Sequence, residues 1–284
     1  MSDKISIVNS ISKGGVGKSF ISIQLAEYFA SLNRKVLLID LDHQQLNSCL
    51  YIADQRDLGS DSQVKLKDLL IFIMDNFSKL YKQDEASTDE LNTKLINSIF
   101  TRGNISVIAS DPTINDLDLR IKEFSSSRFL LSILAAFAFD IYDVVIFDCP
   151  PDSSKALVKS AFSAAKNLII PTLADEFSIK GIKNTLKLYD EIKITDNPDL
   201  NLVGIVINQF KTTHSVDLAY KDYIKEMFPG MVVEPILSYY ADYKNAIAER
   251  EFILNYKSRG SVNKNAVTQM EALLSGIEAK LVKE

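Results

Sequence analysis

The sequence has few of the residues and patterns on which several protein classes depend. It contains two cysteines, Cys49 and Cys149, and no CxxC pair, which argues against a disulfide framework, a zinc knuckle or an iron–sulfur site within one chain. Its longest apolar stretch, Phe129 to Phe139, falls far short of the roughly 20 residues that span a bilayer. The N-terminus lacks the basic-then-apolar pattern of a signal peptide. We therefore expect a soluble, cytoplasmic protein.

A global excess of positive charge is also missing. The chain has 32 Lys and Arg against 37 Asp and Glu, a formal net charge of −5, so binding to nucleic acid would need a local basic patch. With 284 residues, 46% of them hydrophobic, the chain is long enough to bury one large core. We expect a single domain over residues 1–284.

Apolar strand-like runs alternate with helical segments along the chain. Several runs are apolar without alternation, as expected of parallel strands that are covered by helices on both faces. The runs are Ile5 to Ser10, Lys35 to Ile39, Ile105 to Ile108, Val144 to Phe147, Leu168 to Ile170, Leu202 to Ile207 and Met231 to Val233. This pattern predicts an α/β fold with a mostly parallel central sheet.

Two further segments receive coarser predictions. Residues 54–104 read as a less regular excursion, with a helix over 66–81 and a flexible loop over the polar residues that follow, from Lys82 to about Asn92. A C-terminal helix at about 262–283 should pack one apolar face, formed by Val267, Met270, Leu274, Ile277 and Leu281.

A glycine-rich box, SKGGVGKS at residues 12–19, lies between the first predicted strand and a predicted helix. Glycines at 14, 15 and 17 allow successive backbone N–H groups to point at phosphate oxygens, and the helix N-terminus adds its positive dipole end. Lys18 would contact the β and γ phosphates, and the Ser19 hydroxyl would coordinate Mg²⁺. The box predicts a P-loop nucleoside triphosphatase that binds Mg-ATP.

Acidic residues follow two of the predicted strands. The run VLLIDLD ends with Asp40 and Asp42, whose side chains share one side if the backbone stays extended. The run YDVVIFDCPP closes with Asp148, the position of an acid that holds Mg²⁺ through water in P-loop enzymes. One acid of the DxD pair could organise the magnesium shell and the other the attacking water, although both could also simply cap a strand end.

The box KGGVGKS, with a second lysine at Lys13, resembles the deviant Walker A motif of the ParA/MinD family of ATPases. Further similarities are the acid and double proline at 148–151, the segment PTLADEFSIKG, and Asn208 and Pro235 after later strands. The resemblance extends from Lys4 to about Phe252 and is loose over 54–104. Where related proteins continue the DxD element with proline and glutamine, this chain has His43, Gln44 and Gln45.

This resemblance implies roles for particular residues. Asp42 would position the attacking water, and Lys13 would reach the nucleotide of a second subunit in an ATP-sandwich homodimer. Magnesium would be held by Ser19, Asp40 and Asp148. Nucleotide contacts would come from Lys13, Gly14, Gly15, Val16, Gly17, Lys18, Ser19, Phe20, Asn208 and Pro235.

The family resemblance also implies a slow switch ATPase whose hydrolysis a ParB-like adaptor or another partner stimulates. We expect it to bind non-specific DNA in its ATP state, associate with the nucleoid, and segregate or position a plasmid, chromosome or other cargo. Lys180, Lys183 and Lys187 lie at helical spacing on one face, although such lysines are often simply solvated. The candidate DNA contacts are Lys180, Lys183, Lys187, Lys211, Arg250, Lys257 and Arg259.

Other functions remain open at this stage. A MinD-like ATPase that cycles on membranes is the main alternative, but the C-terminal segment mixes glutamates with its lysines and lacks bulky aromatics. A ligase or iron–sulfur carrier on the same core is a second alternative. A tyrosine kinase of the related bacterial type is a third, and we expect Tyr239, Tyr240 and Tyr243 to be packing or groove residues instead.

Overall fold

A seven-stranded sheet forms the centre of the protein. The computed structural model describes residues 3–42, 47–53, 64–110, 112–152, 154–256 and 264–283. The strand order in the sheet is β3-β4-β2-β5-β1-β6-β7, and only the edge pair β3 and β4 is antiparallel. The strands are β1 (Ile5–Asn9), β2 (Val36–Asp40), β3 (Ile99–Arg102), β4 (Ile105–Ile108), β5 (Val144–Asp148), β6 (Asn167–Thr172) and β7 (Asn201–Ile207). The predicted α/β fold is confirmed.

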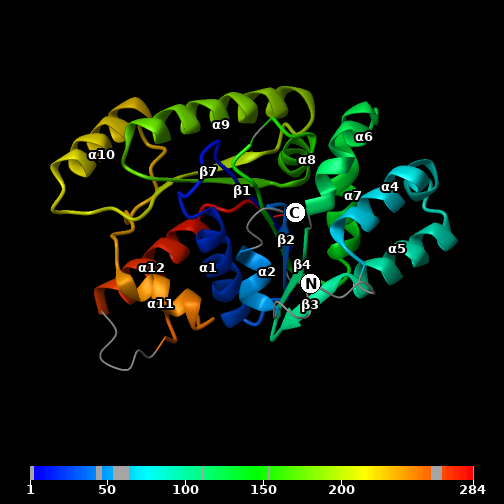
Figure 1. Cartoon of the computed structure of the whole chain (residues 1–284), viewed down its shortest axis with the longest axis horizontal. Helices are drawn as coiled ribbons and strands as arrows, with labels where there is room; N and C mark the ends of the chain where they lie inside the picture. The colour runs from blue at the N-terminus through cyan, green and yellow to red at the C-terminus, as the bar shows by residue number, and fades with distance from the viewer. Residues whose placement is uncertain are drawn as a thin grey trace.

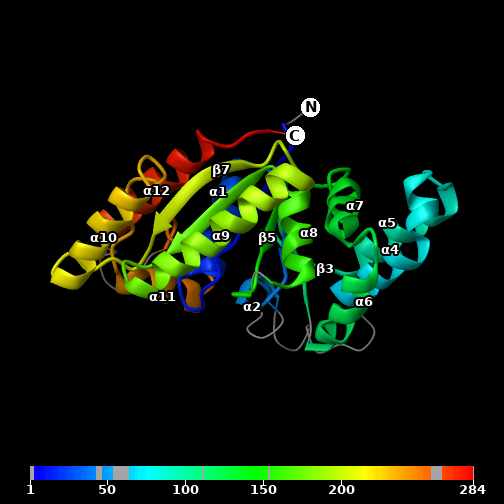
Figure 2. The same ribbon diagram turned by 90° about the horizontal axis from the view of Figure 1, so that it is seen from above.

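Helices cover both faces of this sheet (Figures 1 and 2). The α-helices are α1 (Lys18–Ser31), α2 (Asn47–Ile52), α4 (Leu66–Tyr81), α5 (Glu85–Asn97), α6 (Asp118–Glu123), α7 (Leu130–Ala138), α8 (Ala156–Ala164), α9 (Glu176–Thr195), α10 (Ser215–Met227), α11 (Ala241–Ala248) and α12 (Lys264–Glu278). Short 3₁₀ helices span Pro112–Leu117 and Ser127–Phe129.

The sheet separates two apolar cores because successive side chains of a strand point to opposite faces. In β1, Ile5 and Ile7 join the core that contains residues of α1, α2, α11 and α12. Val8 joins the other core, which contains residues of α4, α7, α8 and α9. Both faces of the sheet are therefore buried. Polar groups collect at the carboxyl ends of the strands, where the parallel connections leave room for ligands.

The polar segment after α4 is a helix, so the prediction of a flexible loop at 82–92 was wrong. Asp84 caps α5 by accepting hydrogen bonds from the backbone N–H of Ser87 at 3.0 Å and from its hydroxyl at 2.7 Å. Leu91 and Leu95, one helical turn apart, bury the inner side of the helix. The capping aspartate was the local sequence signal for this helix.

Two strand assignments also differ from the sequence prediction. Residues 231–233 form no strand and make one parallel bridge, between Val232 and Ile205. A turn at Gly230 precedes the bridge, and Pro235, which has no N–H to continue a ladder, follows it. Strand β3, in contrast, had not been predicted, because this four-residue edge strand is only partly buried.

Helix α12 packs one apolar face against the body of the protein. Met270, Leu274 and Ile277 are buried, together with Ala266 and Leu273. The apolar face is therefore already covered within the chain. Among the described residues, no helix combines the length and apolar character needed to cross a membrane.

Candidate nucleotide-binding site

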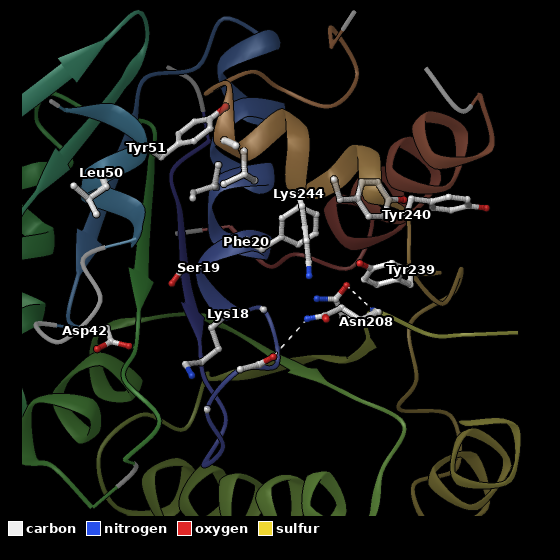
Figure 3. Close-up of a pocket in the computed structure, with 18 of the residues that line it drawn as sticks. Lys18, Ser19, Phe20, Asp42, Leu50, Tyr51, Asn208, Tyr239, Tyr240 and Lys244 are labelled. Carbon is white, nitrogen blue, oxygen red and sulfur yellow. Dashed lines mark hydrogen bonds between the residues drawn. The ribbon is translucent and has the colours of Figure 1, made fainter. Parts of the chain in front are cut away.

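A cavity of about 610 Å³ opens where β1, β2 and β7 end. Figure 3 shows labelled side chains from α1, α2 and the segment around α11 that surround it. Its lining residues are Gly14, Gly15, Gly17, Lys18, Ser19, Phe20, Ile23, Asp42, Leu50, Tyr51, Pro151, Asn208, Gln209, Ser238, Tyr239, Tyr240, Tyr243, Lys244, Ile247, Ala248 and Arg250. The glycine box thus forms one wall of a pocket that is large enough for a cofactor.

The glycine loop has an open side and a closed side. A Cβ atom added to Gly14 or Gly15 would meet no atom within 4 Å, so the loop backbone there faces open space. Gly17 has a φ of +95° and immediately precedes α1, and a Cβ on it would lie 2.2 Å from Nδ2 of Asn208. Helix α1 then directs its N-terminal N–H groups toward the loop. This arrangement suits the phosphate chain of a nucleotide.

Lys18 is held inside the loop. Its ammonium donates a hydrogen bond to the carbonyl of Lys13 at 3.1 Å, and its side chain is largely buried. Burial lowers the pKa of Lys18, against the opposing attraction of Asp148 and Asp42. A phosphate group beside Lys18 would therefore neutralise a largely buried cation.

Lys13 points to a different group. Its ammonium donates to both carboxylate oxygens of Asp175, at 2.7 and 2.5 Å, and to the hydroxyl of Ser178 at 3.0 Å. Asp175 is also the N-cap of α9, because it accepts the backbone N–H of Ser178 at 2.8 Å. Burial alone would raise the pKa of Asp175, but the hydrogen bonds from Lys13 and Ser178 hold it below its ordinary value. Lys13 is not among the residues that line the cavity.

The acid at the end of β5 lies under the glycine loop. Asp148 is fully buried and accepts hydrogen bonds from the hydroxyls of Ser48 at 2.7 Å, Ser22 at 3.3 Å and Ser19. Burial raises the pKa of Asp148, while these hydroxyls oppose the shift. Ser19 and Asp148, predicted to share a magnesium ion, are thus in contact.

Of the two acids of the DxD element, one is fully buried in the sheet and the other lines the cavity. Strand β2 ends at Asp40, and the backbone N–H of Asp42 donates to the Asp40 carboxylate at 3.0 Å. Asp40 is fully buried beside Asp148, its partner in the parallel register. Burial, with repulsion from Asp148, raises the pKa of Asp40 to about 8. Asp42 alone lines the cavity.

An aromatic wall faces the glycine loop. The ring of Phe20 lies 5.5 Å from that of Tyr243, and Tyr240 contacts Tyr243 edge-on at 5.6 Å. Asn208 completes this wall and donates to the carbonyl of Val16 at 3.0 Å. Pro235 does not line the cavity. In the segment that follows β7 and α10, the residues that line it begin at Ser238. The tyrosines are cavity and packing residues, as the sequence predicts.

The predicted DNA contacts fall into separate groups. Lys180, Lys183 and Lys187 are exposed along α9, and Lys211 is exposed beside Tyr239, with its ammonium 5.6 Å from that ring. Arg250 instead lines the cavity and does not belong to this surface row. Lys257 and Arg259 lie outside the described residues, as do His43, Gln44 and Gln45.

Sequence reasoning missed several residues of the site. Leu50, Tyr51 and Lys244 line the cavity, and Asp175 holds Lys13. The spacing of Asp175 and Ser178 is a capping signal, so the cap could have been predicted. The ion pair with Lys13 could not, because 162 residues separate the two partners.

The residues present fit ATP and magnesium. The open face of the glycine loop and Lys18 suit a phosphate chain, and Asn208 with the aromatic wall suits a base. The Ser19 hydroxyl and the Asp148 carboxylate are oxygen donors of the type that Mg²⁺ prefers. Such an ion would neutralise phosphate charge during phosphoryl transfer.

Comparison with known proteins gives matches over most of the chain. Residues 2–202 match a family model described as an AAA domain. The cell division protein PomZ of Myxococcus xanthus is 27% identical over 95% of this chain and 76% of its own length. The chromosome partitioning protein ParA of the same organism is 27% identical over 79% of this chain and 72% of its own. Among solved structures, the ATP complex of a McdA variant from Cyanothece covers 98% of both chains with a TM-score of 0.78 and 17% identity, which shows the fold.

Proposed function

The chain belongs to the AAA domain family, among the P-loop ATPases of the ParA/MinD type, and we propose that it is an ATP-dependent dimerising switch. In its ATP state it binds non-specific DNA in the cytoplasm and positions a plasmid, a chromosome or another cargo. A ParB-like adaptor or another partner stimulates hydrolysis. The observation that carries this proposal is the cavity, in which the glycine loop, Lys18 and Asp42 meet an aromatic wall.

The local contacts of the glycine loop support ATP hydrolysis. Lys18 and the loop N–H groups would bind the phosphate chain, and Ser19 and Asp148, which are in contact, would hold magnesium, with Asp40 beside Asp148. Among the described residues that line the cavity, Asp42 is the one with a carboxylate, which supports a role in orienting the attacking water. Positioning and charge neutralisation are the main requirements of this reaction.

Lys13 supports the dimeric part of the proposal. Its ammonium lies outside the wall of its own cavity and is therefore available to the nucleotide of a second copy once it leaves Asp175. A cation brought to the transferred phosphoryl group by a second subunit can raise the rate of transfer strongly. Nucleotide binding, dimerisation and hydrolysis would then be linked through this one side chain.

The exposed lysines of α9 support binding to DNA. Lys180, Lys183 and Lys187 share one face of a 20-residue helix. A dimer doubles this row, so the local charge can attract phosphates although the chain is acidic overall. Binding of this kind needs no contact with base edges and weakens as salt is raised.

The proposal is tested by binding to a long DNA duplex of arbitrary sequence, with ATP, with ADP and without nucleotide, over a salt series. We expect binding only with ATP, and loss of binding in Lys13→Ala. The double variant Lys183→Ala/Lys187→Ala should reduce the salt dependence, because each lost phosphate contact lowers the slope of log K against log salt by about 0.9.

A matched pair of lysines serves as the control. Lys79 and Lys82 are exposed at the end of α4, so Lys79→Ala/Lys82→Ala removes the same charge elsewhere. If dimerisation is intact and no nucleotide state binds DNA, the DNA part of the proposal is wrong. ATP-dependent sedimentation with liposomes in that case would indicate a membrane scaffold.

A further inference from the structure

Helices α1, α4 and α11 end in the same hydrogen-bonded turn, and α11 places an arginine at its left-handed position. The N–H of Arg250 donates to the carbonyl of Ile247 at 3.0 Å, and the N–H of Glu251 donates to that of Ala246 at 2.8 Å. These two bonds define a Schellman motif, whose left-handed residue is usually glycine. Arg250 has a φ of 55°. A side chain with this backbone is strained, and such residues gather at functional sites.

The strained backbone of Arg250 is fixed by a second arginine. The guanidinium of Arg102 donates to the carbonyl of Arg250 at 2.8 Å and to that of Tyr51 at 3.2 Å. It also pairs with the carboxylate of Glu27 at 2.5 Å and stacks over the Tyr51 ring at 4.4 Å. The end of α11 is therefore tied to β3, α1 and α2 through one planar group.

Arg250 is one of the residues that line the cavity that contains the glycine loop. The charged residues in this lining are Lys18, Lys244, Arg250 and Asp42, so three cations face one carboxylate. A cavity with this balance favours an anionic ligand. The aromatic wall and Asn208 suit a base, and a guanidinium suits the anionic part of a nucleotide.

We propose that Arg250 contacts the phosphate chain of the bound nucleotide and that Arg102 positions it for this contact. A guanidinium matches phosphate oxygens with paired hydrogen bonds, which a lysine cannot reproduce. The inference rests on the proposed binding of ATP. It adds a phosphate contact that comes from the end of α11, more than 230 residues after the glycine loop.

The decisive variant is Arg250→Gly, with Gln83→Gly as its matched control. Gln83 has a φ of 57° at the equivalent position after α4, with the same pair of hydrogen bonds, and does not line the cavity. Glycine suits this backbone, so both variants should fold, which melting curves recorded without nucleotide would check.

Calorimetric titration with AMPPNP and Mg²⁺, with ADP and with adenosine measures the contact. We expect Arg250→Gly to weaken AMPPNP binding about tenfold, or about 1.4 kcal/mol, and to leave adenosine binding unchanged. Arg250→Lys should restore part of the affinity, and Gln83→Gly should bind like the unchanged protein.

Two results would overturn the inference. Unchanged AMPPNP affinity in Arg250→Gly would exclude the contact, and an equal loss for adenosine and AMPPNP would place Arg250 away from the phosphates. If the unchanged protein binds no AMPPNP, the proposed function fails as a whole. Normal binding by Arg250→Gly overturns this inference alone.

Discussion

Replacing Asp175 with asparagine should strengthen ATP-dependent dimerisation. In the single chain, the Lys13 ammonium is paired with Asp175 and hydrogen-bonded to Ser178. If Lys13 acts on the nucleotide of a second copy, it must first leave Asp175. The substitution Asp175→Asn removes the charge that retains Lys13 but keeps the cap of α9, because asparagine caps helices as well as aspartate does.

The size of the effect follows from the exposure of the pair. The side chains of Lys13 and Asp175 retain 19% and 34% of their exposed area, so solvent screens the attraction in part. A pair of this kind contributes about 1 kcal/mol. Both protomers must release Lys13, which gives about 2 kcal/mol per dimer and about a 30-fold tighter dissociation constant.

Sedimentation equilibrium with AMPPNP and Mg²⁺ would measure this constant. Asp84→Asn is the matched control, because Asp84 caps α5 in the same way and lies on a helix whose residues do not line the cavity. It should dimerise like the unchanged protein. In a Lys13→Ala background, Asp175→Asn should give no gain. Weaker dimerisation in Asp175→Asn would refute the reasoning, since Asp175 would then support Lys13 in the dimer.

Three further predictions concern stability. Gly17→Ala should lower the melting temperature and reduce the free energy of unfolding by about 3 kcal/mol, because the added Cβ would lie 2.2 Å from the Asn208 side chain on a left-handed backbone. Gly14→Ala, with open space around it, should reduce the free energy of unfolding far less. Asn167→Leu should lower the free energy of unfolding in urea by about 3 kcal/mol, because the buried amide of Asn167 is hydrogen-bonded to the backbone of Ser6 and of Val282 in the C-terminal segment. An unchanged urea midpoint would show that these hydrogen bonds contribute little to stability. Asp40 has a folded pKa raised from 3.8 to about 8, so in EDTA the free energy of unfolding should decline as pH rises through this window, and Asp40→Asn should flatten the decline; an equal slope in both proteins would contradict the assignment.

The sheet and the glycine loop could be predicted because their signals are local. The six parallel strands were found as apolar runs, since burial on both faces removes polar alternation. The loop follows from its glycines and the helix after it, which define a backbone conformation within eight residues. The edge strand β3 and helix α5 were missed because partial burial leaves a weak pattern.

The opposite wall of the cavity could not be predicted in the same way. Asn208 reaches Val16, and the tyrosines around residue 240 reach Phe20, only because helical crossovers bring these segments together. Pro235 was assigned to this wall by resemblance, but the lining residues of this segment begin three residues later, at Ser238. The different burial of the two acids of the DxD element was likewise not visible in the sequence, because Asp40 lies beside Asp148 of the neighbouring strand while Asp42 lines the cavity.

Left-handed backbone alone does not identify a functional residue in this protein. Asn33, Gln83 and Arg250 share nearly the same φ at the ends of three helices, yet of the three only Arg250 lines the cavity. Asparagine tolerates this conformation better than other side chains, so Asn33 needs no further explanation. What distinguishes Arg250 from Gln83 is the Arg102 clamp and the cationic lining around it. Because Arg250→Gly and Gln83→Gly relieve the same backbone strain, the difference between their nucleotide affinities measures what the Arg250 side chain contributes to nucleotide binding.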